Sequence, residues 1–139
     1  MMKLLRDNRG QATVELALVM PILLLLVIGV FEFGRAWNQK QVITDAARQG
    51  ARICAVANAA PSSFPNNVVD TTVQNALARA GIAAPSGQPV VTGFQSGTGK
   101  PCTVSISVPL NFVFLGPLIG WVNGAETFTL TSVFTMRNE

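Results

Sequence analysis

A long apolar run near the N terminus limits what this chain can fold into more than any other feature of its sequence. Between Gln11 and Phe31 the only charged residue is Glu15. These 21 residues would form a helix about 31 Å long, which matches a bilayer hydrocarbon core of about 30 Å. The sequence therefore predicts one membrane-spanning helix.

The head in front of this run is basic, because Lys3, Arg6 and Arg9 outnumber its single acidic residue. The positive-inside rule then places the head in the cytoplasm and the remainder outside it. A cleaved secretory signal is disfavoured, because the run exceeds the usual ~7–15 apolar residues and a cut after residues 34–36 would require an arginine in the recognised motif. The chain is thus divided into a cytoplasmic leader (1–10), a transmembrane segment (11–35) and an extracytoplasmic domain (36–139).

Composition argues against nucleic-acid binding and against catalysis. The head holds three of the ten basic residues and one of the seven acidic ones, so the rest of the chain is nearly neutral. The basic charge of the head therefore bears on membrane topology and not on nucleic-acid binding. The chain has no histidine and no tyrosine. Its cysteines are too far apart for a zinc motif. We expect a non-enzymatic protein with no cofactor, no metal site and no small-molecule substrate.

Glu15 and Pro21 are the two unusual residues of the apolar run. An ionised carboxylate costs about 2.5–3.5 kcal/mol at the bilayer centre, so Glu15 suggests that another group pairs with it inside the membrane. The alternative is that Glu15 lies at the level of the lipid headgroups. Pro21 removes a backbone donor and crowds the carbonyl of Ala17, which predicts a kink. The kink is either an ordinary one or a weak point where the helix stretches during packing.

Two stretches of the sequence resemble a known family. Residues 9–21 and 130–139 are similar to the N-terminal segment and to the closing strand, with its Met-Arg-x-Glu tail, of TadE-like minor pilins. These proteins belong to the tight-adherence (Flp-type) branch of type IV pili. Residues 55–100 resemble nothing specific. Major Flp pilins carry an aromatic residue where this chain has Leu16, which favours a minor pilin.

The resemblance implies a route of processing and assembly in the bacterial inner membrane. A prepilin peptidase would cut after Gly10, which leaves Gln11 as the new N terminus and Glu15 as the fifth residue. The new α-amino group would have an ordinary pKa of about 7.7–8.0, so a carboxylate on a neighbouring helix can pair with it where the dielectric is low. The implied partners are membrane lipid, the peptidase, other pilins and the pilus assembly platform.

Beyond the span, the apolar pattern predicts a pilin-like α+β domain. The first helix should continue to about Ala57, and a second, short helix should cover 68–80, with Asn67 as its N-cap and Gly81 at its end. Small and apolar residues at steps of three and four should form the buried stripe of the long helix. They are Ile43, Ala46, Ala47, Gly50, Ala51 and Cys54.

Alternating apolar and Ser/Thr residues predict strands over 89–95, 102–108 and 126–136. The second strand keeps its parity past Pro109. Such alternation is typical of an antiparallel sheet with one solvated face, on which the long helix would pack. The side chains of the last strand expected to point inward are Phe128, Leu130, Phe134 and Met136.

Cys54 and Cys102 both lie on faces expected to meet in the core. Outside the cytoplasm such a pair would be oxidised, and the 49-residue loop that it closes would stabilise the fold by roughly 4 kcal/mol on the chain-entropy estimate. The alternative is two unpaired buried thiols.

The connection over residues 111–123 is unusually apolar. It either caps the small core or forms an exposed patch that docks another subunit or the membrane surface. The candidate contact residues are Leu115, Leu118, Ile119, Trp121 and Val122.

Three functions remain open on the sequence alone. The first is a minor pilin that takes part in assembly of a tight-adherence pilus for surface attachment. The second is a single-span anchored domain that never polymerises and acts as a binding domain or assembly chaperone. The third, an anchored hydrolase, is disfavoured by the missing histidine.

Overall fold

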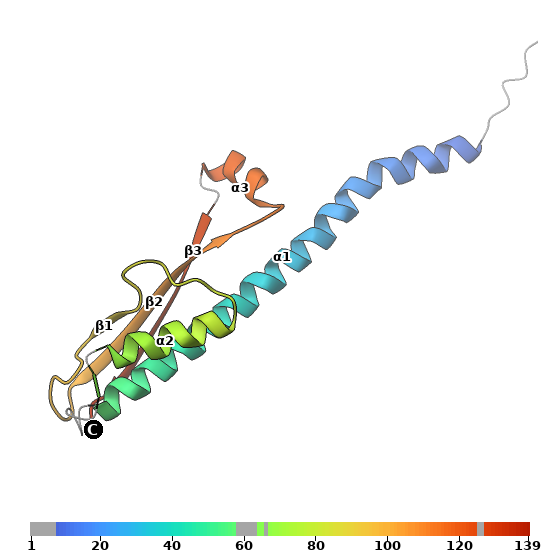
Figure 1. Cartoon of the computed structure of the whole chain (residues 1–139). Helices are drawn as coiled ribbons and strands as arrows, with labels where there is room; N and C mark the ends of the chain where they lie inside the picture. The colour runs from blue at the N-terminus through green and yellow to red at the C-terminus, as the bar shows by residue number, and fades with distance from the viewer. Residues whose placement is uncertain (1–7, 58–63, 66, 125–126) are drawn as a thin grey trace, which may run out of the picture.

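Helix α1 (Asn8–Ala57) runs the length of the molecule in a computed structural model that describes residues 8–57, 64, 65, 67–124 and 127–139 (Figure 1). The other elements follow it in the order α2 (Val68–Arg79), β1 (Val90–Thr92), β2 (Pro101–Asn111), α3 (Gly116–Asn123) and β3 (Thr127–Arg137). This arrangement confirms the predicted α+β class. Most of the expected leader, together with Glu126 at the expected start of the last strand, lies outside the described residues.

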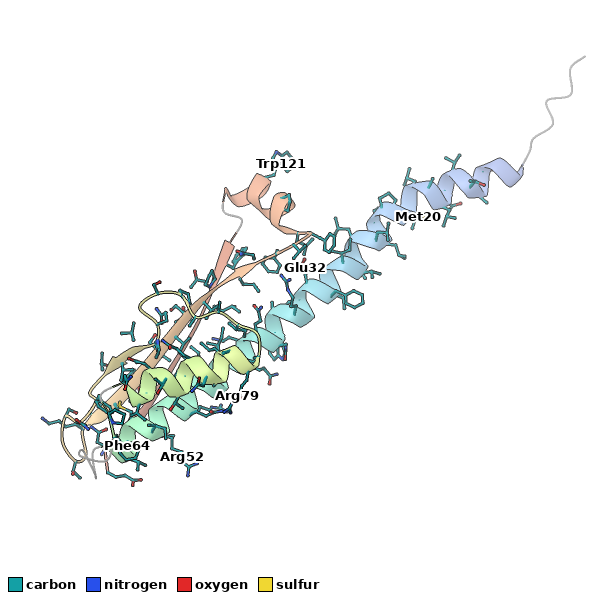
Figure 2. All side chains as sticks on the ribbon, viewed as in Figure 1. Met20, Glu32, Arg52, Phe64, Arg79 and Trp121 are labelled. Carbon is teal, nitrogen blue, oxygen red and sulfur yellow. A yellow bond between two sulfur atoms is a disulfide. The ribbon has the colours of Figure 1, made fainter. Side chains whose placement is uncertain are left out.

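The N-terminal half of α1 projects away from the rest of the protein, whereas its C-terminal half lies against α2 and the sheet (Figure 1). The helix continues through Pro21. Figure 2 labels Met20, beside this proline, in the part of α1 where the helix axis changes direction. Side chains of residues 11–27 are exposed all round the helix. The described residues therefore offer the side chains of 11–27 no packing partner.

The predicted stripe on the C-terminal half of α1 is confirmed, because all six of its residues are buried. Gly50 shows why small residues are needed there. A Cβ atom at Gly50 would lie 2.7 Å from Cγ2 of Val73 on α2 and 3.3 Å from Cγ1 of Val104 on β2. Helix α1 thus approaches a second helix and the sheet at one point.

Helix α2 runs back alongside α1 (Figure 1) and buries Val69, Val73 and Leu77. Its C terminus is a Schellman motif, in which Ile82 N–H donates to the carbonyl of Leu77 and Gly81 N–H to that of Ala78, both at 3.0 Å. The motif needs a left-handed residue, and Gly81 has φ +69°. At the other end, Asn67 is the N-cap residue as expected, but its side chain makes no cap hydrogen bond.

The three strands form an antiparallel sheet in the order β1-β2-β3. Alternate side chains of β2 are buried from Cys102 to Leu110. The opposite face carries hydroxyl pairs across β2 and β3, with Thr103 and Thr135 at 2.8 Å and Ser107 and Thr131 at 3.1 Å. The predicted solvated face is confirmed.

Strand β2 continues past Pro109 to Asn111 in unbroken register with β3. Strand β1 pairs only with residues 103–105 of β2, so the other edge of β2 is open at Pro109, and a missing N–H there costs no bond to β1.

Phe128 is more exposed than expected. It pairs with the buried Leu110 and so lies on the expected face of β3, but its side chain is 42% exposed, and its ring packs edge-on against Phe112 with the centroids 5.5 Å apart. Leu130, Phe134 and Met136 are partly buried against the core as expected.

The structure joins Cys54 of α1 to Cys102 of β2 in a disulfide, with their Cα atoms 6.2 Å apart. Both side chains are fully buried. The bond links the long helix to the central strand at the end of the domain farthest from the apolar run.

Candidate functional site: the membrane-facing half of helix α1

The expected cleavage bond between Gly10 and Gln11 lies in the first turn of α1, which begins at Asn8. N–H groups of a first turn have no partner within the helix, and glycine has a low helix propensity. Both residues are exposed. Local opening of this turn would therefore cost little.

Glu15 is exposed on the apolar half of α1, one turn beyond Gln11. Within the part of the chain that the structure describes, its carboxylate forms no salt bridge. Leu18 and Val14, on the same side of the helix, are also exposed. The carboxylate of Glu15 therefore stands among apolar side chains with no cation supplied by these residues.

Glu32 is a second carboxylate on this helix, and it has the opposite environment. Its side chain is only 5% exposed. Its Oε1 accepts hydrogen bonds from the backbone N–H groups of Val113 and Phe114, both at 2.9 Å. Its Oε2 lies 3.7 Å from Nη2 of Arg35. A carboxylate that accepts two amide hydrogen bonds fixes a loop firmly to the helix.

Arg35 and Lys40 extend the same attachment along α1. Arg35 donates to the carbonyl of Asn111 at the end of β2, and Lys40 donates to the carbonyl of Thr131 on β3. These contacts begin at Glu32, where the apolar run ends, so the domain starts directly beside the predicted membrane surface.

Glu32 was not predicted as a functional residue. A signal was nevertheless present, since Glu32 and Arg35 follow the last apolar residue of the run with helical i,i+3 spacing. Its partners, the amides of Val113 and Phe114, are about 80 residues away and carry no recognisable motif.

No helix was predicted in the apolar connection between β2 and β3, but residues 116–123 form helix α3. Pro117 occupies its first turn, where a missing N–H is harmless, and Gly124 ends it with φ +70°. Among the predicted contact residues, Leu115 is partly buried and Trp121 is 86% exposed. The side chains of Leu118, Ile119 and Val122 lie outside the described residues.

Comparison with known proteins gives a match to one family model. Residues 10–52 match the family model of TadE-like proteins. The match covers most of α1 and ends before α2 and the sheet. No curated protein and no solved structure matches the chain. The resemblance of the N-terminal segment to TadE-like proteins is thereby confirmed.

The fold and the match together define a class. Among the described residues, α1 is the helix long and apolar enough to cross a membrane, and none of its most apolar stretch is buried in the protein. TadE-like proteins are a pilus-associated structural family and not an enzyme family. These findings are consistent with a membrane-anchored pilus component. Within that class, residues 10–52 are similar to TadE-like proteins, which is consistent with a protein of the tight-adherence pilus system.

Proposed function

We propose that the chain is a minor pilin, which a prepilin peptidase cuts after Gly10 and which then joins a tight-adherence pilus through its apolar helix. The observation that carries the proposal is Glu15. It is exposed within residues 11–27 of α1, whose side chains are all exposed among the residues that the structure describes, and it lies inside the segment that matches the TadE-like family model.

The contrast with Glu32 supports an intermolecular role for Glu15. Glu32 obtains its hydrogen bonds from Val113 and Phe114 of its own chain. Glu15 has no comparable salt bridge among the described residues, and an uncompensated carboxylate in a membrane is costly. Cleavage after Gly10 would give each subunit a cationic N terminus. Pairing of that amine with Glu15 of a neighbouring subunit would remove the cost and set the register of the helices.

The N-terminal residue of the protein purified from membranes of its own cell tests the processing step. A mature chain that starts at Gln11 supports the pilin role. Gly10→Leu should retain the ten-residue head, because a bulky side chain would obstruct the peptidase. Gly34→Leu is the matched control, because Gly34 likewise has no atom within 4 Å of a Cβ position, and it should be cut normally.

Incorporation into the pilus fraction tests the role of Glu15. Glu15→Ala should leave the protein in the membrane, since it removes a polar cost, but should deplete it from sheared pili. Leu18→Ala, an equally exposed position on the same helix half, should assemble like the parent. If the Glu15→Ala protein enters pili as well as the parent does, the pairing role is wrong.

A second candidate function is a single-span anchored domain that binds a partner or assists assembly without polymerising. The exposed Trp121 on α3 favours it, because large exposed aromatic side chains are common interface anchors. A mature chain that starts at Met1 and never enters the pilus fraction would select this alternative.

A further inference from the structure

The segment 112–124, called here the α3 lobe, exposes apolar side chains at the end of the domain nearest the apolar half of α1. Phe114 is 68% exposed, and Trp121, labelled in Figure 2, points away from the body of the domain. The lobe contains no charged residue. Its transfer to a less polar environment would therefore carry no cost for burying a charge.

The lobe is held at a defined level along α1. Glu32 binds the amides of Val113 and Phe114, and Arg35 holds the carbonyl of Asn111. Counting about 1.5 Å per residue from Gln11, Glu32 lies roughly 32 Å along the helix. That distance corresponds to the outer boundary of a hydrocarbon core of about 30 Å.

The surface of the lobe is continuous with that of the apolar run. An open groove between them is lined by Ile28 and Phe31 of the run and by Val113 and Phe114 of the lobe, with Glu32 and Arg35 beside them. Phe31 is itself exposed. The environment that surrounds the end of the span, lipid or headgroups, must therefore also contact the lobe.

Both tryptophans of the chain lie near this boundary. Trp37 follows Phe31 by six residues on α1 and is exposed, as is Trp121. Tryptophan is enriched where hydrocarbon meets headgroups, because its ring is apolar while its N–H needs a polar partner.

We infer that the α3 lobe lies in the interfacial layer of the outer leaflet, with a phospholipid acyl chain in the groove between the lobe and Phe31. The membrane-resident subunit then holds its domain against the bilayer until it leaves the membrane. The inference rests on the proposed function only in that α1 must cross the membrane.

Lipid-borne quenchers test the inference with the full chain in phosphatidylcholine vesicles. Trp37→Phe leaves Trp121 as the only tryptophan of the protein. Phosphatidylcholine brominated near the headgroup should quench Trp121 strongly, and phosphatidylcholine brominated near the bilayer centre should quench it less. A second variant, Trp37→Phe/Trp121→Phe/Leu24→Trp, reports the span, and the quenchers near the centre should be the more effective ones there.

The two variants separate failure of the inference from failure of the proposed function. If Leu24→Trp is quenched at the bilayer centre but Trp121 is not quenched at any depth, the lipid contact is wrong while the membrane anchor stands. If neither tryptophan is quenched, α1 does not cross the bilayer, and both proposals are overturned. If Trp121 is shielded from aqueous acrylamide only at high protein density, without quenching by brominated lipid, a second copy covers the lobe and the inference is overturned.

Glu32→Ala tests how the lobe is positioned. Removal of the carboxylate releases the amides of Val113 and Phe114, so the quenching of Trp121 by headgroup-proximal bromine should fall while the quenching of Leu24→Trp stays constant. Glu15→Ala, which removes another carboxylate of the same helix, should leave Trp121 unchanged. Unchanged quenching of Trp121 in the Glu32→Ala protein would mean that Glu32 does not position the lobe.

Discussion

Residues 11–31 and 37–57 of α1 share one continuous helical backbone but differ in what surrounds their side chains. The first stretch is rich in leucine and exposed on nearly every side. The second has a narrow stripe of alanine, glycine and cysteine buried against α2 and the sheet. A helix of uniformly large apolar residues suits a lipid or helix-bundle environment, whereas a stripe of small residues suits close packing within a water-soluble domain.

The two carboxylates of the apolar region show the same difference at the level of single groups. Glu32 is buried, and its oxygen is satisfied by two backbone amides. Glu15 is exposed among leucines. One carboxylate is thus part of the fold, and the other is the one that we propose for assembly. Substitutions in the C-terminal half of α1 should therefore change stability, whereas substitutions in the N-terminal half should change association.

The largest effect on stability is expected from loss of the disulfide. Cys54→Ser should lower the free energy of unfolding by about 2–4 kcal/mol and reduce the amount of protein recovered. Thermal unfolding of the full chain in detergent measures the change. Leu24→Ala in the exposed half of α1 is the control and should leave the transition of the domain in place.

Mass spectrometry of the non-reduced protein gives an independent check of the same bond. A peptide that joins Cys54 to Cys102 is expected from protein made in an oxidising compartment. Recovery of both thiols in the free state would contradict the pairing.

The sequence predicted the elements whose side chains follow a regular period. The buried stripe of α1 and the alternation of β2 were both visible, because one face of each element is apolar over several residues. Helix α3 was not predicted, because glycine and proline within a short segment disfavour a helix. In the structure Pro117 lies in the first turn of the helix, and Gly124 ends it.

The hydrogen bonds between Glu32 and the backbone amides at Val113 could not be predicted in the same way. It depends on where the end of β2 meets α1, which is set by the register of the whole domain. A carboxylate that binds backbone amides needs no particular side chain on its partner, so the partner segment leaves no sequence signal. The exposed position of Phe128 has a similar origin, because β3 extends beyond the part of the sheet that the helices cover.

A smaller effect on stability is expected from adding a side chain at Gly50, where α1 lies close to α2. Gly50→Ala should destabilise the protein by about 1–3 kcal/mol, because its Cβ would lie 2.7 Å from Cγ2 of Val73. Gly29→Ala in the apolar half is the matched control, since nothing lies within 4 Å of its Cβ position. Chemical unfolding in detergent should show a loss for Gly50→Ala and none for Gly29→Ala. Equal behaviour of the two variants would contradict the distinction between the halves.

The smallest effect is expected at the rim of the packed half, where Arg48 of α1 covers β3. Its guanidinium carbon lies 5.5 Å from the ring centroid of Phe134, and its Nη1 lies 3.6 Å from Oδ1 of Asp45. Both charged side chains are largely exposed, so the ion pair should contribute only tenths of a kcal/mol. The contact with Phe134 should contribute about 0.5–1 kcal/mol.

A double-mutant cycle of Arg48→Gln and Phe134→Leu isolates the ring contact from the ion pair. The coupling free energy from unfolding of the four proteins should be positive and should persist in high salt, where the contribution of Asp45 is screened. Arg52→Gln, one turn farther along α1, should change the stability by less than Arg48→Gln. A coupling free energy of zero would mean that Arg48 is only a solvated residue. The residues of α1 that stabilise the domain would then be limited to its buried stripe.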